Sequence, residues 1–324
     1  MMTFLIFTLS AVIVVLASIQ LNRFGDVISQ KSKLSGAVVG TFLIAGATSL
    51  PELTTSLTAV YIDNPDIAVG NMLGSNIFNV LILAFIDLIY RRKRMFNMIE
   101  PKQHLPSAFA AMVFTGVVVL SLVLNSSITI FNIGIEMFIL VGLYVFTVRY
   151  FDNNEEKEMV EDEAAATGKD YSLKAASVGF AVSAVIVFAA GSALSIFGDQ
   201  LAQQTGMNSS FVGSFLIAAS TSLPELITVL VALKLANYDM AVGSILGSNL
   251  FNLQLLAITD IFYQKGPILN ATSGGNLPIA LLFIGMVGLI LYMMRRKSYG
   301  GLLHYAAPSF LIVVMYFISS YFLF

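Results

Sequence analysis

Apolar residues in this chain gather into long runs that are separated by short polar segments. Ten of these runs are long enough to cross the hydrocarbon core of a bilayer as helices, which takes about 20 residues. We place them at 3–22, 36–60, 66–90, 107–125, 130–150, 173–197, 209–235, 240–263, 277–294 and 305–323. The pattern predicts an all-α integral membrane protein with ten transmembrane helices.

The composition supports the same fold class. Hydrophobic residues make up 57% of the 324 residues and charged residues only 11%, and the mean hydropathy is +0.85. These values exclude a soluble globular protein. The first run has no basic leader and no small-residue cleavage site, so we interpret it as a retained transmembrane helix. The chain has no cysteine, which excludes disulfides and thiolate metal sites.

Basic residues are distributed unevenly among the predicted loops. All but one of the 17 Lys and Arg residues fall on one side of the ten-helix arrangement. They lie at 23–33, 91–102, 149–174, 234 and 295–297, and only Lys265 lies on the other side. The positive-inside rule therefore predicts that these loops are cytoplasmic and that both termini are outside.

The chain contains an internal repeat. Residues 40–90 align without a gap on residues 213–263, at an offset of 173, and 29 of the 51 positions are identical. Each half holds five predicted helices, and because five is odd, the second half must have inverted topology. We therefore divide the chain into a first inverted repeat at 1–150, an acidic cytoplasmic linker at 151–172, and a second inverted repeat at 173–324.

A proline-glutamate motif lies in the middle of one predicted helix of each half. The two copies read Thr48-Ser49-Leu50-Pro51-Glu52 and Thr221-Ser222-Leu223-Pro224-Glu225. Proline has no amide hydrogen and clashes with the carbonyl four residues earlier, so we expect the carbonyls of Ala47 and Ser220 to be released. An ionised glutamate at this depth costs at least about 2.5–3.5 kcal/mol. A bound cation or a proton must therefore neutralise Glu52 and Glu225.

The following helix of each half carries a second repeated motif. Gly74-Ser75-Asn76-Ile77-Phe78-Asn79 recurs as Gly247-Ser248-Asn249-Leu250-Phe251-Asn252. Ser75 and Asn79 are four residues apart and share a helix face, as do Ser248 and Asn252. These side chains supply oxygen donors, which suit a hard cation such as Ca²⁺ or Na⁺. Asn76 and Asn249 lie off that face, and interhelical hydrogen bonding is the better interpretation for them.

Other polar residues have simpler interpretations. We assign Gly70, Gly74, Gly243 and Gly247 to close helix packing, Asp66 and Asp239 to helix starts, Asp87, Asp260 and Glu136 to the membrane interface, and His104 and His304 to loops. On this interpretation no histidine lies near the membrane midplane, where a proton carrier would be needed.

The paired motifs resemble those of the calcium/cation antiporter superfamily, in particular the prokaryotic type of Na⁺/Ca²⁺ exchanger. The resemblance covers both repeats and implies exchange of Ca²⁺ for Na⁺ by alternating access in the cell membrane of a prokaryote. It implies that Glu52 and Glu225 are the central Ca²⁺ ligands, and that Asn79 and Asn252 complete the centre. It also implies that the flanking Na⁺ sites take oxygens from Thr48, Ser49, Ser75, Thr221, Ser222 and Ser248.

The sequence departs from the exchanger pattern at two places. Ala47 and Ser220 precede the Thr-Ser pairs where the family has glycine, and Asn252 stands where well-known Na⁺/Ca²⁺ exchangers have an acidic residue. The site therefore has two carboxylates instead of three. Proton-coupled relatives resemble this arrangement too, so a Ca²⁺/H⁺ antiporter is the alternative function.

Two other functional classes fit the sequence less well. A passive cation channel usually builds its pore from rings of identical elements, whereas an inverted repeat with paired buried acids suits alternating access. An intramembrane enzyme lacks support, because the chain has no cysteine nucleophile, no histidine predicted near the midplane and no His-Glu-x-x-His zinc motif. We expect no enzymatic activity, no cofactor and no nucleic-acid partner; the expected partners are the lipid bilayer and the ions Ca²⁺ and Na⁺ or H⁺.

Overall fold

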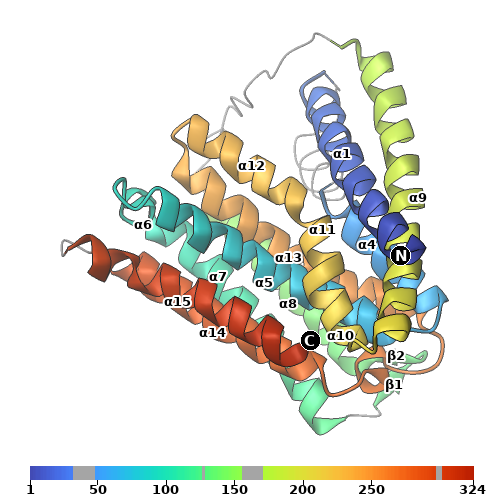
Figure 1. Cartoon of the computed structure of the whole chain (residues 1–324). Helices are drawn as coiled ribbons and strands as arrows, with labels where there is room; N and C mark the ends of the chain where they lie inside the picture. The colour runs from blue at the N-terminus through green and yellow to red at the C-terminus, as the bar shows by residue number, and fades with distance from the viewer. Residues whose placement is uncertain (32–47, 126–127, 155–170, 297–300) are drawn as a thin grey trace.

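The computed structural model describes residues 1–31, 48–125, 128–154, 171–296 and 301–324. The described part is almost entirely helical (Figure 1). Ala47, the first part of the predicted span 36–60 and most of the predicted linker lie outside the described residues.

The first half of the chain holds six helices and one small hairpin among its described residues. The helices are α1 (Met2–Lys31), α4 (Leu50–Tyr61), α5 (Pro65–Ile89), α6 (Met95–Met98), α7 (Pro101–Leu124) and α8 (Ile135–Asn154). The hairpin pairs β1 (Thr129–Ile130) with β2 (Ile133–Gly134) in antiparallel register.

The second half continues with helices of several kinds. They are α9 (Leu173–Thr205), α10 (Ser209–Phe211), the π-helix η2 (Val212–Ile217), α11 (Ala218–Thr221), α12 (Leu223–Lys234), α13 (Tyr238–Phe262), the 3-10 helix η3 (Ile268–Ala271), α14 (Asn276–Arg295) and α15 (Leu302–Leu323).

Seven helices in the described part are long and apolar enough to cross a membrane: α1, α5, α7, α9, α13, α14 and α15. The segments Ser209–Thr221 and Leu223–Lys234 form one further apolar pair, which is bent by 42° between them. These helices indicate an integral membrane protein. The count of ten stays a prediction, because the span 36–60 is described only in part and α8 is not among the seven.

Several predicted boundaries differ from the structure, and the helix of the predicted span 107–125 begins already at Pro101. The predicted spans 3–22 and 173–197 belong to helices that continue to Lys31 and Thr205, because helical backbone extends past the apolar run into polar residues. The predicted span 130–150 begins with the hairpin, and its helix starts only at Ile135. The hairpin turn is made by Phe131 and Asn132, whose φ angles of 54° and 64° are those of a tight two-residue turn.

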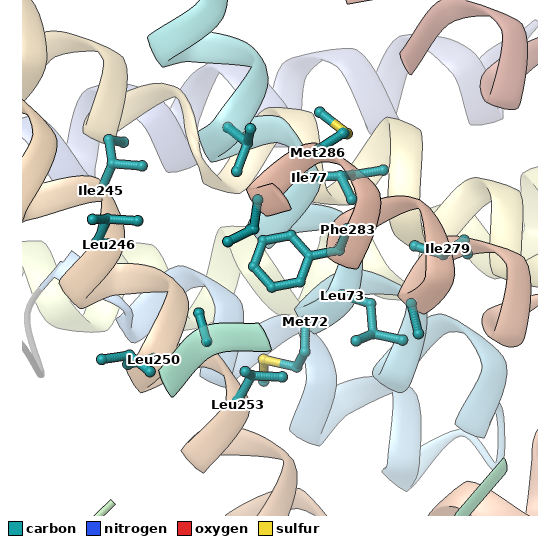
Figure 2. Close-up of a cluster of buried hydrophobic side chains, with 14 of the residues drawn as sticks. Met72, Leu73, Ile77, Ile245, Leu246, Leu250, Leu253, Ile279, Phe283 and Met286 are labelled. Carbon is teal, nitrogen blue, oxygen red and sulfur yellow. The ribbon is translucent and has the colours of Figure 1, made fainter. Parts of the chain in front are cut away.

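The helices α5 and α13 form the centre of the molecule. In their most apolar stretches 72% and 67% of the residues are buried, against 28% in α1 and α15. Figure 2 shows apolar side chains of these two helices and of α14 meeting in the core, including Met72, Leu250 and Phe283. The repeated Ser/Asn motifs therefore lie on the two best-shielded helices, where a polar group must find a partner.

The helices α1 and α9 lie side by side, at an angle to α14 and α15 (Figure 1). Much of their apolar surface is exposed, which suits contact with lipid. The helix α9 also packs along α4, where the Thr58 hydroxyl donates to the Ser192 hydroxyl at 2.9 Å. The pair α1 and α9 thus borders the element that carries Glu52.

The predicted close packing is confirmed at two of the four glycines. A Cβ atom at Gly74 would lie 2.2 Å from the carbonyl oxygen of Ser214, and one at Gly70 would lie 3.0 Å from that of Ser210. A Cβ at Gly243 would make an ordinary contact with a side chain, and one at Gly247 would meet no described atom within 4 Å. The close approach therefore joins α5 to the segment α10–η2.

Candidate cation site

The two proline-glutamate motifs stand at helix starts. The helix α4 begins at Leu50 and α12 begins at Leu223, so each proline lies in the first turn. The preceding residues have matching backbone angles: φ and ψ are −96° and 10° at Ser49 and −91° and 6° at Ser222. The missing proline amide costs little at this position. Each glutamate follows in the first turn, where the helix dipole favours a negative charge.

The two carboxyl groups are buried and lie close enough to repel each other electrostatically. Glu52 is 0% exposed and Glu225 is 5% exposed. The Ser222 hydroxyl donates to Oε1 of Glu52 at 3.4 Å, which joins the two motifs directly. Oε2 of each glutamate has no hydrogen-bond donor in the described part of the chain. A cation between these groups would remove the repulsion and satisfy both oxygens.

Asn71 on α5 fixes the backbone beside this carboxyl pair. Its Nδ2 group donates to the Glu52 carbonyl at 3.1 Å and to the Thr55 hydroxyl at 2.7 Å. Its Oδ1 accepts from the Thr221 hydroxyl at 3.4 Å, so Asn71 also connects the two halves. The sequence reasoning missed this residue, because the aligned position in the second half is Ser244 and carries no repeat signal.

Four buried asparagines link α5 to α13. Asn79 donates through Nδ2 to Oδ1 of Asn249 at 2.9 Å, and Asn252 donates through Nδ2 to Oδ1 of Asn76 at 3.1 Å. Asn76 in turn donates to the Asn249 carbonyl at 3.2 Å. The predicted interhelical hydrogen bonding of Asn76 and Asn249 is confirmed. Oδ1 of Asn79 and Oδ1 of Asn252 accept from no described group.

The remaining predicted oxygen donors differ in burial and in hydrogen-bond partners. Ser75 is fully buried and its hydroxyl has no described partner, whereas Ser248 is half-buried. Ser49 is buried and Thr48 is half-buried. The Ser220 hydroxyl on α11 donates to the Leu216 carbonyl on η2, four residues earlier, at 2.8 Å. Release of the Ser220 carbonyl stays a prediction, and so does the role of Ala47.

Asp87, which the sequence assigns to the membrane interface, is covered by other parts of the protein. Asp87 is 0% exposed and accepts from the hydroxyls of Tyr305 and Ser309, the latter at 2.6 Å. Both donors come from α15, which packs on the end of α5. Position near the end of a span therefore does not imply contact with water or lipid headgroups here.

Asp260 and Glu136 are also buried, at 1% and 3% exposure. Asp260 accepts from the backbone amides of Gly134 and Ile268 at 2.8 and 2.6 Å, because the hairpin and the loop after α13 fold over it. Neither carboxyl oxygen of Glu136 has a hydrogen-bond partner in the described part. The assignment of both acids to the membrane interface stays a prediction, and the structure adds that neighbouring elements cover them.

The histidines are not in loops. His104 lies in α7, is 6% exposed and pairs with Asp239 at 2.8 Å through Nε2. His304 lies in α15, beside Arg296. Both predicted loops are helix starts. The helix α7 begins at Pro101, and it carries neither of the two repeated motifs.

The described residues contain no group of three or more His, Cys, Asp or Glu side chains that could hold a metal ion. A cation bound at Glu52 and Glu225 would therefore need neutral oxygens from amides, hydroxyls or backbone carbonyls. The asparagines and serines described above are oxygen donors of that kind.

The sequence is similar to a known protein family and to known membrane proteins. The family model for sodium/calcium exchanger protein matches residues 2–151 and 175–324. The inner membrane protein YrbG of Escherichia coli is 27% identical over 231 residues, which are 71% of this chain and 70% of YrbG.

Two solved exchangers have a similar fold. The H⁺/Ca²⁺ exchanger CAX has a TM-score of 0.64 at 13% identity, over 99% of this chain and 89% of CAX. The sodium-calcium exchanger NCX_Mj has a TM-score of 0.56 at 21% identity, over 98% of this chain and 97% of NCX_Mj.

Proposed function

This chain belongs to the sodium/calcium exchanger protein family, and we propose that it exchanges Ca²⁺ for Na⁺ by alternating access. The family match covers both halves of the chain and makes it a membrane antiporter, not an enzyme. The identity of the counter-ion and the residues that bind the ions belong to the proposal.

One observation carries the assignment of the site. Five buried side-chain oxygens of the predicted ligand set have no hydrogen-bond donor in the described part of the chain. They are Oε2 of Glu52, Oε2 of Glu225, Oδ1 of Asn79, Oδ1 of Asn252 and Oγ of Ser75. Each buried oxygen without a donor costs about 1–3 kcal/mol. A hard cation satisfies such oxygens, and Ca²⁺ and Na⁺ both prefer oxygen ligands.

The charge of the site suggests how the exchange is balanced. The two glutamates carry two negative charges, which balance one Ca²⁺ or two Na⁺. Thr48, Ser49, Ser75, Thr221, Ser222 and Ser248 would supply the neutral oxygens of the Na⁺ sites, together with the carbonyls of Ala47 and Ser220. The simplest cycle from this charge count exchanges one Ca²⁺ for two Na⁺ and moves no net charge.

A Ca²⁺/H⁺ antiporter is the second candidate. The site has only two carboxylates, and each of them has an oxygen without a donor that a proton could occupy. The fold similarity to an H⁺/Ca²⁺ exchanger, with a TM-score of 0.64, is no lower than that to a sodium-calcium exchanger, with a TM-score of 0.56. Protons on Glu52 and Glu225 would balance the same charge as two Na⁺.

We also propose that the ten helices form two inverted repeats with both termini outside. Corresponding parts of the two halves make corresponding contacts, which supports the repeat. Asp66 at the start of α5 accepts from the Ser273 amide, and Asp239 at the start of α13 accepts from the Glu100 amide, each at 2.8 Å. Asp66 and Asp239 are 173 positions apart, and so are Glu100 and Ser273. This is the same offset as that between the two motifs.

The experiment is a flux measurement with purified protein in proteoliposomes. Uptake of radioactive Ca²⁺ is measured with an outward Na⁺ gradient at equal pH, and separately with a pH gradient in the absence of Na⁺. We expect saturable uptake that requires Na⁺ on the opposite side. Uptake driven by the pH gradient alone would establish the second candidate, and uptake without any counter-ion would indicate a channel.

A further inference from the structure

The amide network between α5 and α13 has a crossed pattern. Asn79 on α5 gives its Nδ2 hydrogen to Asn249 on α13, and Asn252 on α13 gives its Nδ2 hydrogen to Asn76 on α5. In each pair the donor belongs to the predicted ligand set. The acceptor lies three positions before the predicted ligand of its own helix: Asn249 before Asn252, and Asn76 before Asn79.

This pattern fixes the orientation of the two ligand amides. A carboxamide has one nitrogen and one oxygen, so anchoring the nitrogen determines where the oxygen points. All four asparagines are at most 1% exposed, so water does not compete for these bonds. A cation is attracted by the amide oxygen and repelled by the NH₂ hydrogens. The orientation therefore decides whether Asn79 and Asn252 can serve as ligands.

We propose that Asn76 and Asn249 are positioning residues of the cation site, which keep the amide oxygens of Asn252 and Asn79 available to the transported ion. The inference rests on the proposed function, because it takes Asn79 and Asn252 as ligands. Asn76 and Asn249 act through these two residues, and neither binds the ion through its own side chain.

The two positioning residues are held differently. Nδ2 of Asn76 donates to the Asn249 carbonyl at 3.2 Å, so its amide cannot turn over without losing that bond. Nδ2 of Asn249 has no acceptor in the described part of the chain. The orientation of Asn249 therefore depends on its bond to Asn79, and the pair Asn79–Asn249 is the better one to perturb.

The test compares the Ca²⁺ KM and the maximal flux of variants in proteoliposomes. Asn249→Leu removes the acceptor, frees the Asn79 amide to turn, and is expected to raise the Ca²⁺ KM about tenfold, the factor given by a loss of about 1.4 kcal/mol. The matched control is Asn276→Leu, which replaces an equally buried asparagine that donates to Asp66 outside the site. The control is expected to keep the wild-type KM.

A double-mutant cycle separates positioning from a general structural effect. If Asn249 acts only through Asn79, adding Asn249→Leu to Asn79→Leu raises the KM no further. A structural effect of Asn249 would instead add to that of Asn79→Leu. An additive double variant, or an unchanged KM in Asn249→Leu, overturns the inference.

Asn249→Ser serves the same comparison if the leucine variant does not fold, because a serine hydroxyl is too short to replace the amide oxygen. The outcomes also separate the two levels of the argument. A wild-type protein that shows no counter-ion-dependent Ca²⁺ flux overturns the proposed function and this inference together. A wild-type protein that transports Ca²⁺, with an unchanged KM in both Asn249 variants, overturns this inference alone.

Discussion

Gly74→Ala should loosen the contact that holds α5 against η2. The added Cβ would lie 2.2 Å from the carbonyl oxygen of Ser214 and 2.3 Å from its Cα. Ordinary contacts between carbon atoms are about 3.5–4.0 Å, so the two segments must separate by more than 1 Å. The obstacle is backbone, which cannot turn away as a side chain does. A Cβ added at Gly213 on η2 would also lie too close to α5, at 2.7 Å from the Ile67 carbonyl oxygen.

The expected cost follows from two opposing effects. Overpacking a well-packed contact costs about 1–3 kcal/mol, and we expect the upper end because backbone must move. Alanine regains about 1 kcal/mol over glycine in helix propensity. The net loss is about 2 kcal/mol, which corresponds to a fall in melting temperature of about 5 °C for a protein of this size class. Transport should fall as well, because Ser75 is the next residue on α5 and moves with it.

The assay is thermal unfolding of the detergent-purified protein, followed by the loss of the monodisperse peak on size-exclusion chromatography. The control is Gly142→Ala on α8, an exposed glycine whose Cβ would meet no described atom within 4 Å. It should melt at or slightly above the wild-type temperature. Equal melting temperatures for Gly74→Ala and the wild type would refute the argument that this glycine is required by close packing.

Three further predictions follow from single contacts. Asn252→Asp adds a third carboxylate and replaces the amide that donates to Asn76 with a group that only accepts. We expect a stability loss of about 1–3 kcal/mol and an altered counter-ion dependence or current. Unchanged flux and current would contradict this prediction. Glu136→Gln removes a buried acid that lacks donors, so the melting temperature should rise, and a lower one would argue against it. The double variant Thr58→Cys with Ser192→Cys places the only thiols of the chain at a contact between α4 and α9. Oxidation to a disulfide should stop exchange, and reduction should restore it. Full flux in the cross-linked protein would show that these helices need not separate.

The sequence was sufficient to predict the class of fold, and it supplied the residues from which the proposed site is built. Long apolar runs specify membrane helices directly, and the doubled motif identified Glu52, Glu225 and the paired asparagines. The helix break before each proline was also predictable, because proline cannot continue the ladder of backbone hydrogen bonds. The structure adds that the break places each glutamate in the first turn of a new helix.

Features that depend on tertiary contacts were not predictable in the same way. Asn71 was missed because only one half carries it, and the π-helix η2 has no sequence signature of its own. The burial of Asp87 and Glu136 depends on α15 and on the fold around the hairpin, so it does not follow from position along a span. His104 was misplaced because the helix start at Pro101 lies outside the apolar run.

The central claim is that Glu52 and Glu225 bind the transported Ca²⁺. The most direct test is equilibrium binding of radioactive Ca²⁺ to the purified protein, without any gradient or transport. We expect the wild type to bind Ca²⁺, Glu52→Gln and Glu225→Gln each to lose that binding while remaining folded, and Glu136→Gln, which changes an equally buried glutamate outside the site, to retain it. Binding at wild-type affinity by both Glu52→Gln and Glu225→Gln would contradict the account.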